Sequence, residues 1–280
     1  MKETIIVSLT TWYKRIGNIP VVLDSIYSQT IQPDKVVLNL AYDEKIPEDV
    51  AKYIEKQGIE VYYTEDTKVY KKFIPTLKRY PEACVINIDD DSIYPSTMIE
   101  DFMSLHKQYP QYPISGNKVV LYGMQCHCGV ASLTKAEYFG EWLDKIDADV
   151  MRNCSSSDIV FTFMATKNGH PYIHSQAEYF KNIIQPELEK ESYSNLIVKD
   201  DGLEEAYTYL VDRFGKSESP IDRYVSDSVI ADTINHIMQE EIAREVESQK
   251  ERSEKKLRAT KAYRLGKFIL KPFSFLKSKK

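Results

Sequence analysis

The sequence predicts an α/β protein built on a mostly parallel β-sheet that is flanked by helices. Three observations predict this class: short apolar segments rich in β-branched residues, helical segments that alternate with them, and glycine or proline at the joints. Short strands that alternate with helices are typical of right-handed βαβ units, which build parallel sheets. A chain of 280 residues, 42% of them hydrophobic, is long enough to bury a large core.

The first half of the chain alternates regularly. Strands are predicted at residues 5–10, 35–40, 59–63 and 84–88, because each is a short β-rich apolar run. Helices are predicted between and after them, at residues 19–29, 47–57, 72–80 and 95–109, from apolar residues at helical spacing. The second of these helices begins near a proline and ends at Gly58, which are typical start and stop signals.

The second half is less regular. Strands are predicted at residues 118–122 and 129–133, on either side of the sequence Cys126-His127-Cys128. Helices are predicted at residues 158–168, 204–214 and 227–258, the last of them long and highly charged. Residues 183–219 have mixed character, and apart from the helix at 204–214 no element is predicted there.

Three consecutive aspartates, Asp89, Asp90 and Asp91, follow the predicted strand at residues 84–88. Ligands of open α/β sheets bind beyond the carboxyl ends of the strands, which is where these side chains lie. Adjacent carboxylates repel one another unless a cation is present, and Mg²⁺ takes one or two carboxylates together with substrate phosphates. The triplet therefore predicts a site for a divalent cation and a diphosphate. The alternative is a solvated acidic turn that caps the next helix.

The sequence around this triplet resembles the GT-A-fold glycosyltransferases, in the family 2-like branch of bacterial polysaccharide and capsule enzymes. The matching segments are SLTT at the end of the first strand with Arg15 nearby, SIYSQTIQPDKVVLN, and above all KKFIPTLKRYPEACVINIDDDSIYP. The resemblance covers residues 4–170. It implies a Rossmann-like sheet of the nucleotide-diphospho-sugar transferases, in which a D-x-D motif holds Mn²⁺ or Mg²⁺ and the donor diphosphate. Asp89 and Asp91 fit that motif as the metal ligands.

The resemblance also implies residues that bind the donor, all near the ends of the predicted strands: Thr10, Arg15, Asp43, Asp66, Lys72 and Asp90. Thr10 and Arg15 stand where these enzymes seat the base and ribose, and Asp43 and Asp66 stand in loops that often carry an acid for the same purpose. Lys72 precedes IPTL and could balance the diphosphate charge as a compact cation, although its neighbour Lys71 leaves that choice open.

A further acidic position, Asp158, occurs in the sequence SSSDIVF. Family members often open a helix here with two acids, whereas this chain has Ser157 in the first place. The resemblance implies that Asp158 is the catalytic base, which accepts a proton from the acceptor hydroxyl as that oxygen attacks the anomeric carbon with inversion. The alternative is that Asp158 caps its own helix, and one residue can do both.

Two other features concern metal ions. Cys126-His127-Cys128 lacks a second pair of ligands at the spacing of zinc sites, so no zinc is predicted there. His170 or His174 could correspond to the late histidine that some GT-A enzymes use as an extra metal ligand, although a core or surface histidine is the more frequent case.

The function expected from these features is that of an enzyme, a metal-dependent glycosyltransferase of the hexosyltransferase type. It would move a sugar from a nucleotide-diphosphate-sugar donor to a glycan or lipid-linked glycan in surface polysaccharide synthesis. The alternatives are a sugar-1-phosphate nucleotidyltransferase and a non-catalytic peripheral membrane protein that binds Ca²⁺.

A nucleotidyltransferase should have a glycine-rich loop after the first strand, yet residues 9–15 contain no glycine. No G-x-G-x-x-G occurs, which disfavours a dinucleotide-dependent dehydrogenase.

Charge is distributed unevenly along the chain. Residues 250–280 contain twelve Lys or Arg and two Glu, a balance of +10, so with a net charge of −5 overall the remaining residues carry −15. An acidic body argues against nucleic acid as a partner. The tail interleaves Lys and Arg with Phe and Leu, a composition that suits an anionic membrane surface. The alternative is a C-terminal helix that packs on the acidic body.

The expected organisation is a GT-A catalytic domain at residues 1–215, a charged helical extension at 216–258 and a basic amphipathic tail at 259–280. No run of about 18 apolar residues occurs, and the N-terminus lacks the features of a signal peptide. We therefore expect a cytoplasmic protein, peripherally associated with the inner face of the membrane.

Overall fold

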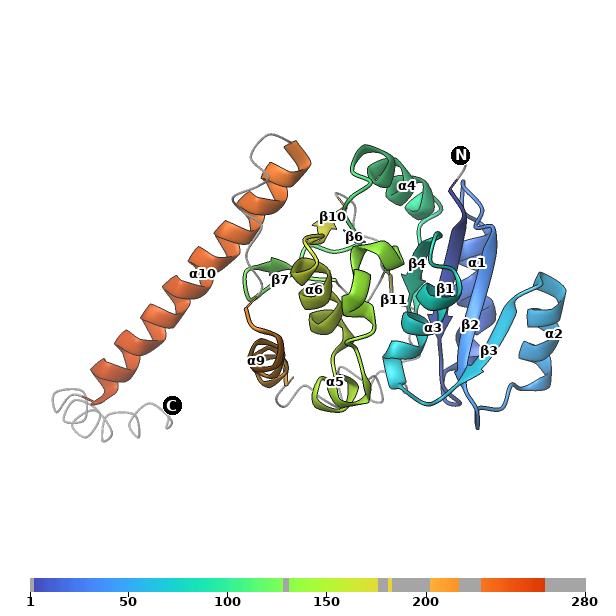
Figure 1. The fold of residues 1–280 in the computed structure, drawn as a ribbon, viewed down its shortest axis with the longest axis horizontal. Coiled ribbons are helices and arrows are strands. Elements are labelled where there is room, and N and C mark those ends of the chain that lie inside the picture. The colour runs from blue at the N-terminus through green and yellow to red at the C-terminus, as the bar shows by residue number, and fades with distance from the viewer. Residues whose placement is uncertain (1–2, 128–130, 176–180, 183–201, 217–227, 260–280) are drawn as a thin grey trace, which may run out of the picture. The chain divides into compact units, whose positions relative to one another are not determined.

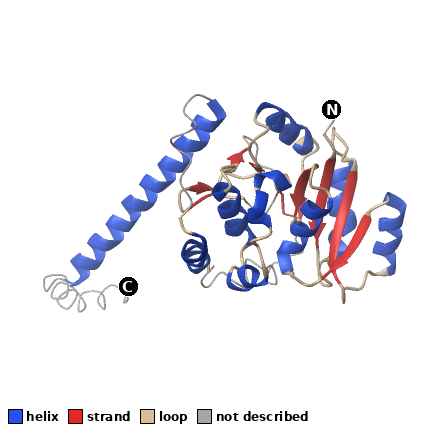
Figure 2. Cartoon of the chain, viewed as in Figure 1, coloured by secondary structure: helices blue, strands red, loops and turns tan. Residues whose placement is uncertain are grey.

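The computed structural model describes residues 3–127, 131–175, 181–182, 202–216 and 228–259. Within these ranges the main sheet has seven strands, in the order β10-β6-β9-β4-β1-β2-β3, and helices flank it (Figures 1 and 2). The four strands β1 (Ile5–Thr10), β2 (Lys35–Ala41), β3 (Glu60–Thr64) and β4 (Cys84–Ile88) are mutually parallel. The predicted α/β class with a mostly parallel sheet is confirmed.

The other half of the sheet brings in short strands from distant parts of the chain. β9 (Ala131–Thr134) pairs antiparallel with β4 and with β6 (Ile114–Ser115), and β10 (Ile173–His174) pairs parallel with β6. β9 is therefore antiparallel to both of its neighbours, and it lies directly beside β4, the last of the mutually parallel strands. The strand predicted at 129–133 corresponds to β9, whereas β6 and β10 were not predicted because two-residue strands carry no periodicity.

The register of the central strands decides where the aspartates lie. β1 pairs with β4 through Val7 opposite Ile86 and Ser8 opposite Asn87, so these two strands end at the same edge of the sheet. Every residue of β4 and the first five residues of β1 are buried, because helices cover both faces of the sheet at its centre. The loops that follow β1 and β4 therefore emerge side by side.

The predicted helices of the first half are present. α1 (Ile19–Tyr27) buries Ile19, Val22, Leu23 and Ile26, the spacing of one helix face. α2 (Glu48–Gln57) ends at Gly58, whose φ of +66° lies in the left-handed region that favours glycine. α4 (Met98–Gln108) starts three residues later than expected. The helix predicted at 72–80 is a 3-10 helix, η2 (Lys68–Lys72), followed by α3 (Ile74–Arg79).

Helices of the second half pack beside the antiparallel strands. α6 (Ser157–Lys167) is buried along nearly its whole length, and α9 (Leu203–Phe214) packs against α6 and against α5 (Ala148–Asn153). Four short 3-10 helices occur in the described chain: η2 and η1 (Ile16–Asn18), and, after β9, η3 (Ala136–Tyr138) and η4 (Gly140–Leu143). Neither α5 nor η4 was predicted.

The strand predicted at 118–122 is only partly present. β7 (Val120–Leu121) forms a separate hairpin with β8 (Met124–Gln125), outside the main sheet. The strand stops because Tyr122 and Gly123 have φ values of 50° and 74°, which make the hairpin turn. A second small pairing joins β5 (Ser92–Ile93), directly after the aspartate triplet, to β11 (Lys181–Asn182).

The last described element is α10 (Ser228–Ala259), in agreement with the helix predicted at 227–258. The chain divides into two compact units, residues 1–233 and 234–280, and this division falls inside α10. The domain boundaries at 215 and 258 stay predictions. The basic amphipathic tail lies outside the described residues, apart from residue 259. In the part of the chain that the structure describes, no helix combines the length and apolar character that a bilayer crossing requires.

Candidate active site

Arg15 and Thr11, from the loop after β1, bind the aspartates that follow β4. Arg15 donates from Nη1 to Asp90 Oδ1 at 3.0 Å and to Asp91 Oδ2 at 2.8 Å, and the Thr11 hydroxyl donates to Asp90 Oδ2 at 2.6 Å. Asp90 is thereby buried under its partners, while Asp91 is partly exposed and 30% of the Asp89 side chain is exposed. The middle residue of the triplet is thus held by the protein, and the outer two face the open edge of the sheet.

Lys72 supplies the second cation. Its ammonium group donates to Asp89 Oδ1, although only 4% of the lysine side chain is exposed. The backbone of Lys72 is held by a hydrogen bond, because the Ser8 hydroxyl donates to its carbonyl oxygen at 2.6 Å. Asn39 Nδ2 in turn donates to Ser8 Oγ at 3.2 Å and to Thr76 Oγ1 at 3.0 Å. Polar residues of β1, β2 and α3 therefore build a buried support for this lysine.

The backbone at the start of the triplet is held as well. The amide N–H of Asp89 donates to the hydroxyl oxygen of Tyr94 at 2.9 Å, and Tyr94 is buried. The N–H of Tyr94 donates to Ser25 Oγ of α1 at 3.2 Å. The loop from β4 to α4 therefore folds back on itself. Because Asp90 is buried and the N-cap of α4 is Thr97, the alternative of a solvated turn that caps the next helix does not describe the triplet.

The charges in this cluster shift one another's pKa. Burial, together with repulsion from Asp89 and Asp90, raises the pKa of Asp91 to about 6 although Arg15 and Lys72 oppose the shift. Burial also raises the pKa of Asp90 against the opposing effect of Arg15 and Thr11. Burial alone would lower the pKa of Lys72, but the nearby carboxylates outweigh it and the net direction is upward. The cluster therefore holds more negative charge than its two cations neutralise.

Asp158 lies in the first turn of α6, and its charge acts on the lysine of this cluster. Its charge contributes to the raised pKa of Lys72, which places the two side chains near each other. Its side chain is 32% exposed, and its Oδ1 lies 3.9 Å from Nδ1 of His127. The N-cap of α6 is Ser156 and not Asp158, so the capping interpretation of Asp158 is wrong. His127 is buried, and its Nε2 lies 3.1 Å from Ser132 Oγ.

The remaining predicted donor residues make contacts with groups other than the aspartate triplet. The Thr10 hydroxyl donates to the Asn39 carbonyl at 2.7 Å. Asp66 pairs with Lys68 and with Lys71, and these cations hold its pKa below the usual range although burial acts in the opposite sense. The structure thus separates the two lysines that the sequence left open: Lys71 pairs with Asp66, and Lys72 pairs with Asp89.

Asp43 is exposed in the turn after β2, whereas its neighbour Glu44 is half-buried. Burial raises the pKa of Glu44, and the charges of Asp43 and Asp66 act in the same direction while Lys71 opposes them. Glu44 also accepts a hydrogen bond from the backbone of Tyr13 in the loop after β1. Of the two acids after β2, Glu44 is therefore the one that contacts this loop.

Comparisons with known proteins bear on the fold. No protein-family model matches the sequence, and no curated protein matches it significantly. Among solved structures, it is similar to the mannosyltransferase PcManGT from Pyrobaculum calidifontis in complex with GDP-Man and Mn²⁺. The two are 13% identical, with a TM-score of 0.57 over 95% of this chain and 83% of that one. The chain has the GT-A fold.

Two further likenesses are weaker. S. aureus TarS 1–349 in complex with UDP is 13% identical, with a TM-score of 0.47 over 79% of this chain and 75% of that one. A 4-diphosphocytidyl-2C-methyl-D-erythritol synthase is also 13% identical, with a TM-score of 0.43 over 71% of this chain and 99% of that one. The TM-scores of both structures are too low to support the fold assignment. That assignment rests on the order of the strands in the sheet, the flanking helices and the similarity to the mannosyltransferase.

In this GT-A fold the outer aspartates of the triplet have the chemistry of a divalent-metal site. Asp89, Asp90, Asp91 and Asp158 provide four carboxylates, against the two cations Arg15 and Lys72, so the cluster carries a formal charge of −2. A divalent cation would neutralise that charge, and carboxylate oxygens are ligands that Mg²⁺ and Mn²⁺ prefer. The raised pKa of Asp91 has burial as its main cause, and repulsion from the carboxylates of Asp89 and Asp90 adds to it.

Three residues of this cluster were not predicted: Thr11, Tyr94 and His127. Thr11 and Tyr94 stand inside the quoted segments SLTT and DDDSIYP, so those segments contained the signal. His127 was considered only for zinc, and the structure instead directs its ring toward Ser132 and Asp158. His170 contacts the Gln111 carbonyl and His174 the Ser175 carbonyl, so the described contacts of these two histidines do not include the triplet.

Proposed function

We propose that this protein is a metal-dependent glycosyltransferase that moves a sugar from a nucleotide-diphosphate-sugar donor to a glycan or lipid-linked glycan acceptor. One observation carries the proposal: an aspartate triplet at the carboxyl end of β4 is bound by Arg15 and Lys72 and faced by Asp158. The GT-A fold supports it, because the similar mannosyltransferase was solved with GDP-Man and Mn²⁺. The coarser conclusion, a nucleotide-sugar transferase fold, is independent of this proposal.

The donor would bind at the edge where the loops after β1 and β4 meet. Asp89 and Asp91 are the residues that would hold Mn²⁺ or Mg²⁺, which when bound neutralises the diphosphate and stabilises it as a leaving group. Lys72 would supply a compact cation to the same diphosphate, since its ammonium already lies at Asp89. Arg15 would keep Asp90 and Asp91 in place through its Nη1 group. Thr10, Asp43 and Asp66 stay proposed contacts of the base and ribose.

Asp158 is the proposed catalytic base. It is partly exposed and near Lys72, so an acceptor hydroxyl could approach it from the open edge of the sheet. Asp158 would accept the hydroxyl proton while the acceptor oxygen forms its bond to the anomeric carbon and the bond to the diphosphate oxygen breaks. A base on the side opposite to the leaving group inverts the anomeric carbon. The acceptor is proposed to be a surface polysaccharide or its lipid-linked precursor, with the basic tail at the inner face of the membrane.

Calorimetry with the purified chain tests the proposal. We expect UDP, GDP or CMP-type nucleotides to bind in the presence of Mn²⁺ and to bind much more weakly after EDTA treatment. A panel of nucleotide sugars should then show hydrolysis or transfer that depends on Mn²⁺ or Mg²⁺. If no nucleotide of the panel binds with either metal, the proposal is wrong.

Three variants separate the roles. Asp91→Asn should lose metal-dependent nucleotide binding, and Asp158→Asn should keep it while turnover falls by about 10²–10⁴-fold, the contribution of a positioned general base. Asp144→Asn is the matched control, because Asp144 is an exposed acid whose partner is Lys78.

Release of pyrophosphate from a nucleoside triphosphate and a sugar 1-phosphate would instead favour a nucleotidyltransferase. An Asp158→Asn variant with full turnover would exclude Asp158 as the base.

A further inference from the structure

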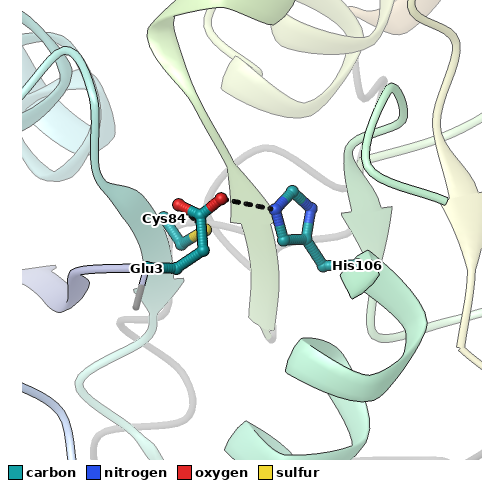
Figure 3. Close-up of side chains that lie close together, drawn as sticks. All are labelled: Glu3, Cys84 and His106. Atoms are coloured by element: carbon teal, nitrogen blue, oxygen red, sulfur yellow. Dashed lines mark hydrogen bonds and ion pairs between the residues drawn. The ribbon is translucent and has the colours of Figure 1, made fainter. Parts of the chain in front are cut away.

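A cluster of three different ligand types lies at the opposite end of β4 from the aspartate triplet. Glu3 precedes β1, Cys84 is the first residue of β4, and His106 lies in the last turn of α4. Figure 3 shows the Glu3 carboxylate between the thiol and the imidazole. One Glu3 oxygen lies 3.7 Å from Cys84 Sγ, and the other lies 3.7 Å from His106 Nε2. One ligand atom from each residue falls within 4.8 Å of the other two.

Hydrogen bonds determine which nitrogen of His106 carries a proton. The Tyr138 hydroxyl donates its single hydrogen to the Pro110 carbonyl at 2.8 Å. Its oxygen must therefore accept at the 3.2 Å contact with His106 Nδ1, which makes Nδ1 the protonated nitrogen. The contact between Nε2 and the Glu3 carboxylate then needs a cation between the two atoms, which is either a proton on Nε2 or a metal ion bound by its lone pair. Histidines that bind metals are oriented in the same way, with the distal N–H donated to a polar partner.

The spacing of the cluster suits a small cation. Oxygen, nitrogen and sulfur ligands around tetrahedral Zn²⁺ stand roughly 3.3–3.7 Å apart, given bonds of about 2.0–2.3 Å. Each Glu3 oxygen lies 3.7 Å from one partner, at the upper end of that range, while one ligand atom per residue falls within 4.8 Å of the other two, so a small closing movement completes the spacing. The thiol and imidazole are buried, whereas 42% of the Glu3 side chain is exposed, so Glu3 is the member that can move and the side from which an ion can enter.

The charges around the cluster favour a divalent ion. Lys135 lies 3.8 Å from Glu3 and 2.9 Å from Glu137, so the two carboxylates exceed the single cation by one negative charge. A metal ion would bind Cys84 as a thiolate, and the thiol proton would leave to solvent. A divalent ion with one thiolate adds one positive charge in total, which balances the excess.

We propose that Glu3, Cys84 and His106 bind one Zn²⁺ ion, with water completing the coordination. A thiolate, an imidazole and a carboxylate form a donor set that zinc prefers over Mg²⁺. The ion joins the start of β1, the start of β4 and the end of α4, so it stabilises the end of the sheet remote from the aspartates. Cys84 and Asp89 are five residues apart along an extended strand, or about 16 Å at about 3.3 Å per residue. This zinc site is therefore independent of the proposed glycosyltransferase chemistry.

Co²⁺ titration of the full-length protein tests the proposal, because Co²⁺ bound to a thiolate has a near-ultraviolet charge-transfer band that oxygen ligands do not produce. We expect one equivalent of Co²⁺ to develop this band and Zn²⁺ to abolish it by displacement. Zn²⁺ should also raise Tm in the wild-type protein. Absence of a thiolate band in the wild-type protein overturns the proposal.

Variants assign the ligands. Cys84→Ser should abolish the band, whereas Cys154→Ser, at a buried cysteine that contacts the Ala206 carbonyl, should keep it. If Cys84→Ser does not fold, Glu3→Gln at the exposed carboxylate serves instead and should remove the Zn²⁺-dependent rise in Tm. Tyr138→Phe should weaken binding by about 10–100-fold, the usual effect of losing the partner that orients a histidine ligand. A band that survives Cys84→Ser would overturn the assignment, and Asp91→Asn should leave it unchanged.

Discussion

The ammonium group of Lys72, at the end of η2, forms an ion pair with the carboxylate of Asp89, which directly follows β4. A lysine with 4% of its side chain exposed is costly to bury unless its charge is compensated. The carboxylates of Asp89, Asp158 and Asp91 provide that compensation, and the hydrogen bond from Ser8 to its carbonyl oxygen fixes the lysine backbone. Lys72 is therefore held at the site as a cation.

Lys72→Met should weaken the binding of a nucleoside diphosphate by about tenfold or more, since a charge-assisted hydrogen bond contributes about 1.5–3 kcal/mol. Affinity for the nucleoside without phosphates should change little. The matched control is Lys71→Met, a lysine that is equally buried but pairs with Asp66. Calorimetry on both ligands measures the ratio, and an equal loss in the two variants would contradict the assigned role of Lys72.

Asp91→Asn should stabilise the metal-free protein at neutral pH. Burial and the neighbouring aspartates raise the pKa of Asp91 to about 6, above the value of about 3.9 for an unfolded chain. The folded state therefore binds the proton more tightly, and ionisation of Asp91 lowers stability as pH rises through this window. A gain of about 1 kcal/mol would raise Tm by about 2–4 °C.

Thermal unfolding in EDTA at several pH values measures this effect. The difference between wild type and Asp91→Asn should shrink as pH falls from about 7 toward 4, because Asp91 of the folded protein becomes neutral below its pKa of about 6 and no longer carries a buried charge. Asp101→Asn is a suitable control, since Asp101 is an acid of α4 outside the cluster. A stability difference that stays constant over this pH range would contradict the explanation.

Thr11→Val should destabilise the protein by about 1–3 kcal/mol, because it leaves a buried carboxylate, that of Asp90, without one of its donors. Valine has nearly the shape of threonine, so packing changes little. Thr97→Val provides the control: Thr97 makes the same hydroxyl–carboxylate contact to Asp101 at 3.1 Å but on the surface, and its loss should cost under about 0.5 kcal/mol. Urea unfolding of both variants gives the comparison, and equal losses would contradict the reasoning.

His127→Phe should lower kcat by about tenfold with little change of the KM for the donor, a smaller effect than the about 10²–10⁴-fold loss expected when a base is removed altogether. The ring packs against Phe73 and Tyr172, so phenylalanine keeps the packing while the nitrogen 3.9 Å from Asp158 is lost. His170→Phe is the control, because that histidine contacts the Gln111 carbonyl. An unchanged pH profile of kcat in His127→Phe would argue that His127 is structural only.

Much of the fold could be predicted from the sequence because the first four strands are local apolar runs with helices between them. The strands at 5–10, 35–40 and 84–88 need no distant partner to be recognised, and the structure has them within one residue. The strands β6 and β10 are two residues long and are defined only by pairing with each other and with β9. No local pattern contains that information.

The candidate site, like the fold, has features that local sequence shows and features that depend on contacts between distant residues. Asp89, Asp90, Asp91 and Asp158 could be singled out because consecutive acids after a strand and an acid at a helix start are visible in the sequence. The sequence did not show which partner each of these aspartates contacts. The structure binds Asp90 to Arg15 and Thr11 and pairs Lys72 with Asp89, which are contacts between residues 17 to 79 positions apart.

By itself, the sequence determined the class of fold, the order of the βα units and the carboxylates at the end of β4, because each depends on hydrophobic periodicity or on neighbouring residues. Only the tertiary structure decided which lysine meets the aspartates, that His127 faces Asp158, and that Glu3, Cys84 and His106 come together. Those pairings arise where strands from distant parts of the chain align in one sheet, since strand register brings together residues that no local pattern connects.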